Sequence, residues 1–424
     1  MNIRHLLASA CIIAPALAQE APATFESGVL LKASDLLPAD MLRGPSYRVR
    51  DQVPTDGYMA YIDIDTDFGT FRAIGVPEAK RRIVEAEAIR KLVETSKGDL
   101  FAQGLKRSVE QPIDAVKNIV TNPVESVKQA PKTVGHFFAK VGSGIGRGVA
   151  KTVDRVSEAA HEDRDPGQSA AAAGRGLGNA AKSAAGFDKA KLDTAKQLGV
   201  DPYSDNARLQ EEMDKVTWAF FAGGLPLRIG AAAASAGLAV AATEMVGVPA
   251  DTYALTSGEL ALRDERALAA MGVSLEDIKN FQIHPALSTT RRHRIVSYLE
   301  VLSKASGRGH IVQLANGCEE AEQAEFLISG LAILAERQRS GAADYVSLKV
   351  LGRLPGGRTA GGQLQVPAPV DHITWTEEVA HVAHRDDLGS DPKVLVHTGT
   401  LSSAAAAGIK AAGWELVAVP YPSR

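Results

Sequence analysis

The chain has 424 residues, with 47 basic and 50 acidic side chains, a formal net charge of −3 and 45% hydrophobic residues. This length exceeds that of one ordinary domain, so two or three domains are expected. The charge balance and an aromatic content of 5% argue against a dedicated nucleic-acid-binding protein, which would carry a basic excess and aromatic residues for base stacking.

Residues 1–18 have the pattern of a secretory signal peptide. Arg4 supplies the positive charge, residues 6–15 form a short apolar core, and the small residues of Ala16-Leu-Ala18 suit cleavage before Gln19. This core is shorter than the roughly 20 apolar residues that cross a bilayer. We therefore expect the protein to be exported, either periplasmic or envelope-associated, or secreted. After cleavage Cys318 would be the only thiol, and we expect it to be buried and unreactive.

The first part of the mature chain is expected to contain an extended leader and a small β module. Residues 19–42 begin Ala- and Pro-rich and predict the leader, while residues 43–98 predict a β-meander followed by a helix. The expected strands cover 47–50, 58–65 and 70–74, and the helix begins at Pro77-Glu78 and runs to about Thr95.

Asp63, Asp65 and Asp67 have a spacing that resembles a calcium-binding loop. Phe68 stands where such a loop requires glycine, however. Alternation along a strand places these carboxylates on the outer face, so we expect a solvated acidic face there.

An 11-residue near-repeat dominates residues 99–160. Gln-Pro-Ile-Asp-Ala-Val-Lys at 111–117 returns as Asn-Pro-Val-Glu-Ser-Val-Lys at 122–128, within a stretch where apolar residues recur every three or four positions. This period predicts one apolar stripe along a surface helix. Pro112 and Pro123 divide that helix into short segments.

The same stretch is basic, with eight Lys or Arg and three acidic residues between positions 101 and 151. Basic charge beside Val and Phe is typical of segments that bind anionic lipid. We expect contact with a membrane surface or an envelope protein. The contact residues would be Phe101, Lys106, Arg107, Lys117, Lys128, Phe137, Phe138 and Lys140. The alternative is that this stripe packs on the protein's own helical domain.

Residues 161–188 are rich in Ala and Gly and predict a linker, and residues 189–340 predict a helical domain. Thr256 with Glu259, and Ser274 with Asp277, have the spacing of helix capping boxes. The uncharged run 229–243 is short for a membrane span and is expected to form a buried, Ala-packed helix.

Arg291-Arg-His-Arg294, within the predicted helical domain, is expected to form a solvated face.

Residues 341–424 predict a small α/β domain. The expected strands are 345–351, 363–366, 393–397 and 414–419, with a turn at 354–357 and helices at 374–384, capped by Thr374, and at 402–412. The final strand, helix and strand predict a parallel crossover.

His381 and His384 lie one helical turn apart, with Glu378 on the same face. Two His and a carboxylate could form a zinc site in a metal-dependent hydrolase. Their order does not match His-Glu-x-x-His, so an exposed amphipathic helix is favoured and no cofactor is expected.

Several short motifs resemble a group of exported proteobacterial proteins with no assigned function. The motifs are Tyr47-Arg-Val-Arg-Asp, Thr55-Asp-Gly, Asp67-Phe-Gly, Val200-Asp-Pro-Tyr, Ala270-Met-Gly-Val-Ser and Pro369-Val-Asp-His-Ile-Thr-Trp. The resemblance implies no activity and no site residues.

Together these patterns predict an α+β protein that is mostly α-helical. They indicate an exported binding or scaffold protein more than an enzyme, with the metal-dependent hydrolase as the alternative. Homo-oligomerisation through the Ala/Gly-rich helices is a further alternative.

Overall fold

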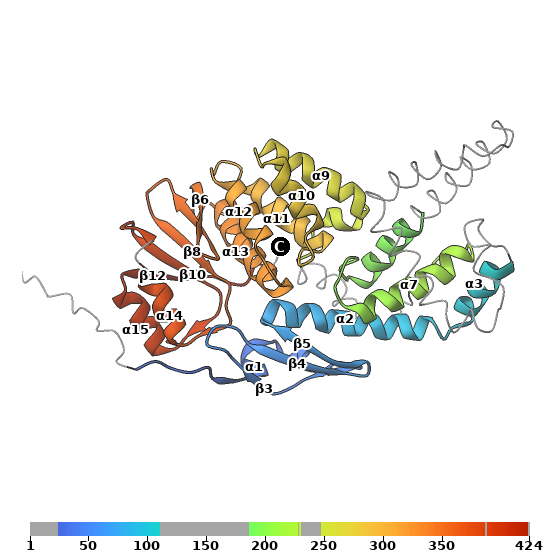
Figure 1. The fold of residues 1–424 in the computed structure, drawn as a ribbon. Helices are drawn as coiled ribbons and strands as arrows, with labels where there is room; N and C mark the ends of the chain where they lie inside the picture. The colour runs from blue at the N-terminus through green and yellow to red at the C-terminus, as the bar shows by residue number, and fades with distance from the viewer. Residues whose placement is uncertain (1–23, 111–185, 228, 230–246, 386–387, 423–424) are drawn as a thin grey trace, which may run out of the picture.

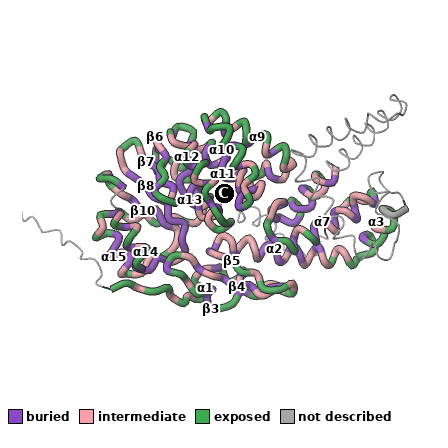
Figure 2. The backbone as a smooth tube through the Cα atoms, in the orientation of Figure 1, coloured by how far each residue is buried: buried purple, intermediate pink, exposed green. Residues whose placement is uncertain are grey.

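The computed structural model describes residues 24–110, 186–227, 229, 247–385 and 388–422. It has an N-terminal β-meander, a helical middle part and a C-terminal mixed sheet (Figure 1). This confirms the predicted α+β class. Buried residues concentrate between the C-terminal sheet and the helices beside it (Figure 2).

The N-terminal module is built on the predicted meander, in the order β2-β4-β5. Its strands are β2 (Tyr47–Val49), β4 (Tyr61–Thr66) and β5 (Gly69–Ile74), all antiparallel. Alternation buries Ile62 and Ile64 completely. Asp63 and Asp65 lie on the other face and form ion pairs of 2.8 to 3.0 Å with arginines of the same module. The predicted outward direction of these carboxylates is confirmed, but Arg50 and Arg72 pair with them and the Asp63 side chain is only 17% exposed.

Residues 30–41 belong to this module and not to an extended leader. β1 (Leu30–Lys32) pairs with β3 (Gln52–Pro54), and α1 (Ala33–Leu36) and η1 (Ala39–Met41) follow. Ala33, Leu37 and Met41 are buried in the meander core.

The helix α2 (Val76–Thr95) follows Gly75 and carries Pro77 in its first turn, as predicted. Its first half, including Ile83, packs on the meander. Its second half, including Leu92, packs on α7 (Ala207–Ala222). The helix α3 (Asp99–Glu110) and a helix over residues 186–198 complete this layer.

The middle part is helical, with α11 and α13 central to its core. Its elements are η4 (Ala250–Tyr253), α9 (Ser257–Ala270), α10 (Leu275–Ile283), α11 (Thr289–Val301), α12 (Arg308–Asn316) and α13 (Ala321–Arg339). Thr256 and Glu259 form the predicted capping box, and Ser274 caps α10. Cys318 is free and buried, as expected.

Among the described residues, no helix is both long enough and apolar enough to cross a membrane. Residues 230–243, most of the uncharged run discussed above, lie outside the described part of the chain.

The C-terminal sheet has the order β12-β10-β8-β7-β6. Its strands are β6 (Tyr345–Leu351), β7 (Leu354–Thr359), β8 (Leu364–Ala368), β10 (Lys393–His397) and β12 (Trp414–Ala418). β7 runs antiparallel to both of its neighbours, β6 and β8. β10 runs parallel to both of its neighbours, β8 and β12. The predicted parallel arrangement of the last two strands around α15 (Ser403–Ala411) is confirmed.

Helices cover both faces of this sheet. Val394 and Val396 of β10 pack with Ile333 of α13. Leu395, which points the other way, packs with Ile409 of α15, next to α14 (Glu377–Ala383). The short strands β9 (His372–Ile373) and β11 (Thr400–Leu401) form a separate parallel pair.

Two local predictions in this domain are wrong. The turn lies at residues 352–353, where Gly352 has a φ of +68°, and residues 354–359 form β7. The N-cap of α14 is Thr376, which accepts a hydrogen bond from the Val379 amide, and not Thr374.

Candidate ligand-binding cavity

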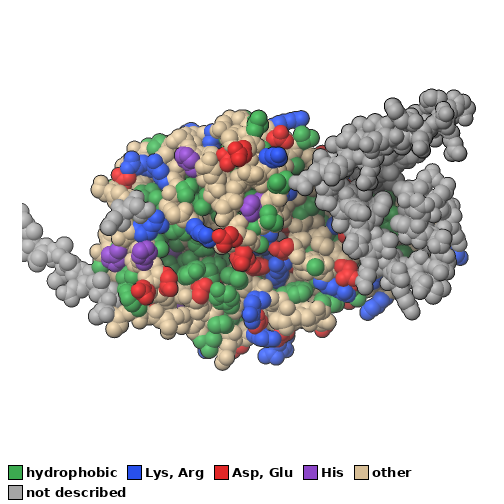
Figure 3. Space-filling view, in the orientation of Figure 1, with side chains coloured by type: hydrophobic (Ala, Val, Ile, Leu, Met, Phe, Trp, Pro, Cys, Tyr) green, Lys and Arg blue, Asp and Glu red, His purple; other side chains and the backbone are tan. Residues whose placement is uncertain are grey.

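A cavity of about 660 Å³ lies where the three parts of the fold meet. It opens on the face shown in Figure 3, where hydrophobic side chains form a hollow bordered by acidic side chains. Its walls come from the loop between β3 and β4, the start of α2, the first turns of α13, the C-terminal sheet and α14.

Most of the lining is apolar. The apolar lining residues are Met59, Ile74, Pro77, Leu314, Phe326, Leu327, Leu354, Val366, Pro367, Ala368, Pro369, Val370, Ile373, Val379, Val382, Ala383, Leu395, Ile409 and Trp414. Pockets of 300 to 1,000 Å³ with this kind of lining and a few polar groups are typical of small-molecule sites.

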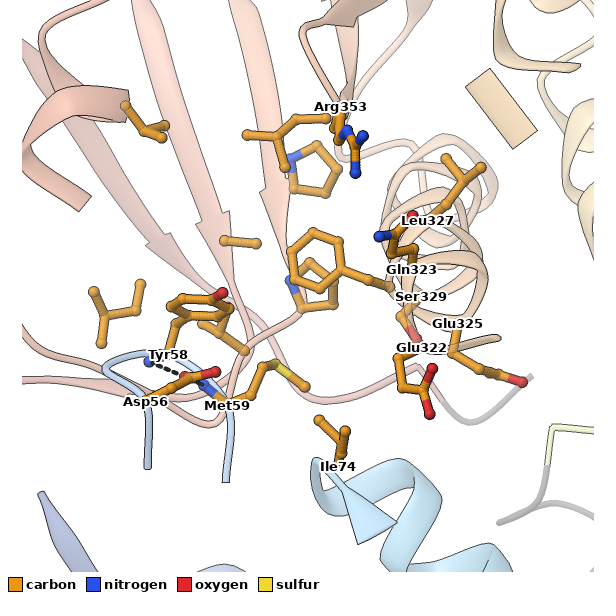
Figure 4. Close-up of a pocket in the computed structure, with 18 of the residues that line it drawn as sticks. Asp56, Tyr58, Met59, Ile74, Glu322, Gln323, Glu325, Leu327, Ser329 and Arg353 are labelled. Atoms are coloured by element: carbon orange, nitrogen blue, oxygen red, sulfur yellow. Dashed lines mark hydrogen bonds between the residues drawn. The ribbon is translucent and has the colours of Figure 1, made fainter. Parts of the chain in front are cut away.

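The helix α13 supplies one wall through its helical spacing. Glu322, Phe326 and Ser329 recur at intervals of four and three residues, so they share one face of the helix. Figure 4 shows Glu322, Gln323 and Ser329 projecting from α13 on one side of the cavity. Asp56 and Tyr58 lie on the opposite side.

Asp56 shapes that opposite wall. Its Oδ1 accepts hydrogen bonds from the amides of Tyr58 and Met59, at 3.1 and 2.8 Å, and its Oδ2 accepts one from the Tyr61 hydroxyl at 2.9 Å. Burial and this hydrogen bond raise the pKa of Tyr61 to about 12, so its hydroxyl remains a donor. The loop that carries Tyr58 is therefore held in one conformation.

The wall is also attached to the C-terminal domain through buried Asp371. This carboxylate accepts hydrogen bonds from the amides of Ala60 and Val76, at 2.9 and 3.1 Å, and from the Tyr421 hydroxyl. The Asp371 amide in turn donates to the Tyr58 carbonyl. One side chain thus joins β4, α2 and the C-terminal domain beside the cavity.

A cluster of four arginines and four carboxylates closes one end of the cavity. Its members are Arg81, Arg82, Arg291 and Arg294, with Glu78, Glu85, Asp205 and Glu325. Glu325 lies 2.9 to 3.1 Å from nitrogens of three of these arginines. Burial alone would raise the pKa of Glu325, but the three guanidinium groups outweigh it and lower the pKa well below its usual range.

The charges on the cavity wall do not balance. Six carboxylates line it, those of Asp56, Glu78, Glu320, Glu322, Glu325 and Glu378, against two arginines, Arg81 and Arg353. The arginine–carboxylate cluster neutralises Glu78, Glu325 and Arg81, and Arg353 pairs with Glu319 outside the lining at 3.2 Å. No ion pair involves Glu320, Glu322 or Glu378 within the described ranges. The mouth of the cavity is therefore negative.

The predicted membrane-contact residues fall mostly outside the described part of the chain. Lys117, Lys128, Phe137, Phe138 and Lys140 all lie there.

Of the remaining contact residues, Phe101 is only 8% exposed and packs in the core that α2 and α7 share. Lys106 and Arg107, on α3, are exposed. Phe101 therefore packs on the protein's own helices, as in the alternative to membrane contact.

The candidate metal ligands do not assemble into a site. The described residues contain no group of three or more His, Cys, Asp or Glu side chains arranged to hold a metal ion. His384 Nδ1 lies 2.8 Å from the Ala380 carbonyl, and its ring and that of Trp375 make a T-shaped contact. His381, His384 and Glu378 are all exposed.

The segment 291–294 is not solvated, contrary to the prediction. Arg291 and Arg294 enter the arginine–carboxylate cluster, and His293 is 1% exposed with Nδ1 2.8 Å from Asp264 Oδ1. Helical spacing cannot reveal such partners, because Asp205 and Glu325 lie 86 and 34 residues from Arg291.

The cavity itself was not predicted. The one local signal was the apolar run 366–370, where two prolines follow a predicted strand.

Comparisons with protein-family models, with curated proteins and with solved structures each found no match for this chain.

Proposed function

We propose that this protein is an exported, envelope-associated binding protein that holds a largely apolar small molecule in the cavity between its three parts. The observation that carries the proposal is the cavity of about 660 Å³ with its mainly apolar lining. Export rests on the signal-peptide pattern of residues 1–18.

The connections around the cavity make it a preformed site. Asp371 and the arginine–carboxylate cluster hold the walls together before any ligand arrives. A preformed site loses less conformational freedom on binding, and this improves affinity.

Filling the cavity tests the proposal. Ser329 is half-buried on α13 and lines the cavity, so Ser329→Trp should occupy part of it. We expect this variant to lose at least tenfold in affinity for an environment-sensitive apolar dye, measured by fluorescence titration of the mature protein.

Ser297→Trp is the matched control, since Ser297 is half-buried on α11 and does not line the cavity. Equal dye binding by wild type and both variants would contradict the proposal.

We also propose that the basic segment 99–160 associates the protein with the envelope surface. The support is its apolar stripe and basic excess, at about 1 kcal/mol per Lys or Arg near anionic lipid. The mature protein should float with anionic vesicles at low salt and be released by high salt, because added ions screen the attraction. A variant with Lys117, Lys128 and Lys140 changed to Glu should not float. Absence of wild-type flotation would reject this part of the proposal.

A further inference from the structure

The cavity mouth combines unpaired carboxylates with an exposed aromatic ring. Glu378 lies at the start of α14, and no ion pair or side-chain hydrogen bond to it occurs within the described residues. Tyr58 is 39% exposed and lies on the same wall as Asp56 (Figure 4). Tyr58 and Glu378 both line this cavity, and burial, Asp56 and Glu378 together raise the pKa of Tyr58.

From this arrangement we infer that the ligand is a cationic amphiphile, with an apolar body along Phe326 and Val366 and an ammonium or guanidinium group between Tyr58 and Glu378. The inference rests on the proposed binding function and names the class of its ligand. Carboxylates attract the cation, and the face of a Tyr ring adds a cation–π contact.

The cavity lining as a whole disfavours an anionic ligand. Its two guanidinium groups are already engaged, Arg81 by Glu325 at 3.1 Å and Arg353 by Glu319 at 3.2 Å. Glu322, on the opposite wall, adds a further negative charge at the mouth. A fatty-acid carboxylate would have to displace one of these pairs and approach like charges.

Calorimetry with three amphiphiles tests the inference on the full mature chain. All three share a ten-carbon chain and end in trimethylammonium, a neutral ethylene glycol ether or a carboxylate, each used below its micelle concentration. We expect the trimethylammonium compound to bind roughly three- to thirtyfold more tightly than the neutral ether, and the carboxylate to bind most weakly. The preference should shrink as salt is raised.

Two neighbouring glutamates on α14 provide a matched pair of variants. Glu378→Gln should weaken binding of the trimethylammonium compound roughly threefold or more and leave the neutral ether unchanged. Glu377→Gln should change neither, since Glu377 is exposed on the same helix but does not line the cavity.

Each outcome has a distinct meaning. Equal binding of the three compounds, tighter binding of the carboxylate, or equal effects of the two variants would overturn the cationic preference alone. Failure of all three compounds to bind would overturn the binding function as well.

Discussion

Asp201 and Glu325 are two carboxylates near the centre of the molecule whose pKa values shift in opposite directions, because only Glu325 has ion-pair partners among the described residues. Glu325 contacts three arginines, so it remains ionised despite its burial. Asp201 accepts hydrogen bonds from the Thr290 hydroxyl at 2.6 Å and the Tyr203 amide at 2.9 Å, but no ion pair to it occurs in the described structure. Burial therefore raises the pKa of Asp201 to about 6.

This difference predicts a pH dependence of stability. The folded pKa of Asp201 exceeds the unfolded value of about 3.9, so its protonated form stabilises the folded state. This stabilisation is present below about pH 4 and is lost as the pH rises through 6. Asp201→Asn keeps the accepting oxygen but cannot ionise. The free energy of unfolding of the variant, relative to wild type, should rise by about 2 kcal/mol between pH 4 and pH 7.

Urea unfolding at several pH values measures this change. Asp193→Asn, at an exposed position on the preceding helix, is the control and should show no such rise. A constant difference between Asp201→Asn and wild type across this range would contradict the assignment.

At the scale of elements, strand β7 shows why a glycine pattern can mislead. Leu354-Pro-Gly-Gly has the composition of a turn, yet it forms a buried strand. Gly357 lies against the ring of Tyr345, where an added Cβ would come within 2.5 Å of a ring carbon. The Tyr345 hydroxyl donates to Gln365 at 2.7 Å across the same sheet. The glycine is needed because the ring of Tyr345 occupies the space of a side chain.

Gly357→Ala should therefore destabilise the protein by about 1 to 3 kcal/mol, the usual cost of overpacking a core. Gly361→Ala, in the loop after β7, should change stability little, because its added Cβ would have only an ordinary contact at 3.8 Å. Denaturant midpoints compare the two variants. Equal midpoints would show that the ring of Tyr345 moves aside at little cost.

At the scale of the whole molecule, the cavity exists because distant segments are held together. Asp371 joins the C-terminal domain to amides 311 and 295 residues away. The arginine–carboxylate cluster joins α2 to α11 and α13. Both sets of contacts flank the cavity, so the attachment of the parts and the shape of the site are coupled.

Asp371→Asn should loosen this attachment. The amide keeps one accepting oxygen but turns its NH₂ group toward a backbone donor. One buried backbone N–H group then has no acceptor, which destabilises the fold by about 1 to 3 kcal/mol. We expect faster hydrogen exchange at the amides of Ala60 and Val76. The exposed control Asp344→Asn should leave that exchange unchanged. Unchanged exchange in Asp371→Asn would show that other contacts hold the parts together.

The local patterns of the sequence determined much of the fold. Alternation predicted the meander with its acidic face, capping signals predicted the starts of α9 and α10, and the final strand–helix–strand pattern predicted the parallel pairing of β10 with β12. These features depend on residues close together in the chain, so their periodicity is visible in the sequence.

Only the tertiary structure decided the candidate site and the position of the buried charges. Arg291 and Arg294 are buried because Glu325 neutralises them, and Tyr58 lines the cavity because Asp371 holds its loop. Burial of a charge depends on partners brought together by packing, and helical or strand periodicity carries no information about partners so far away in the chain.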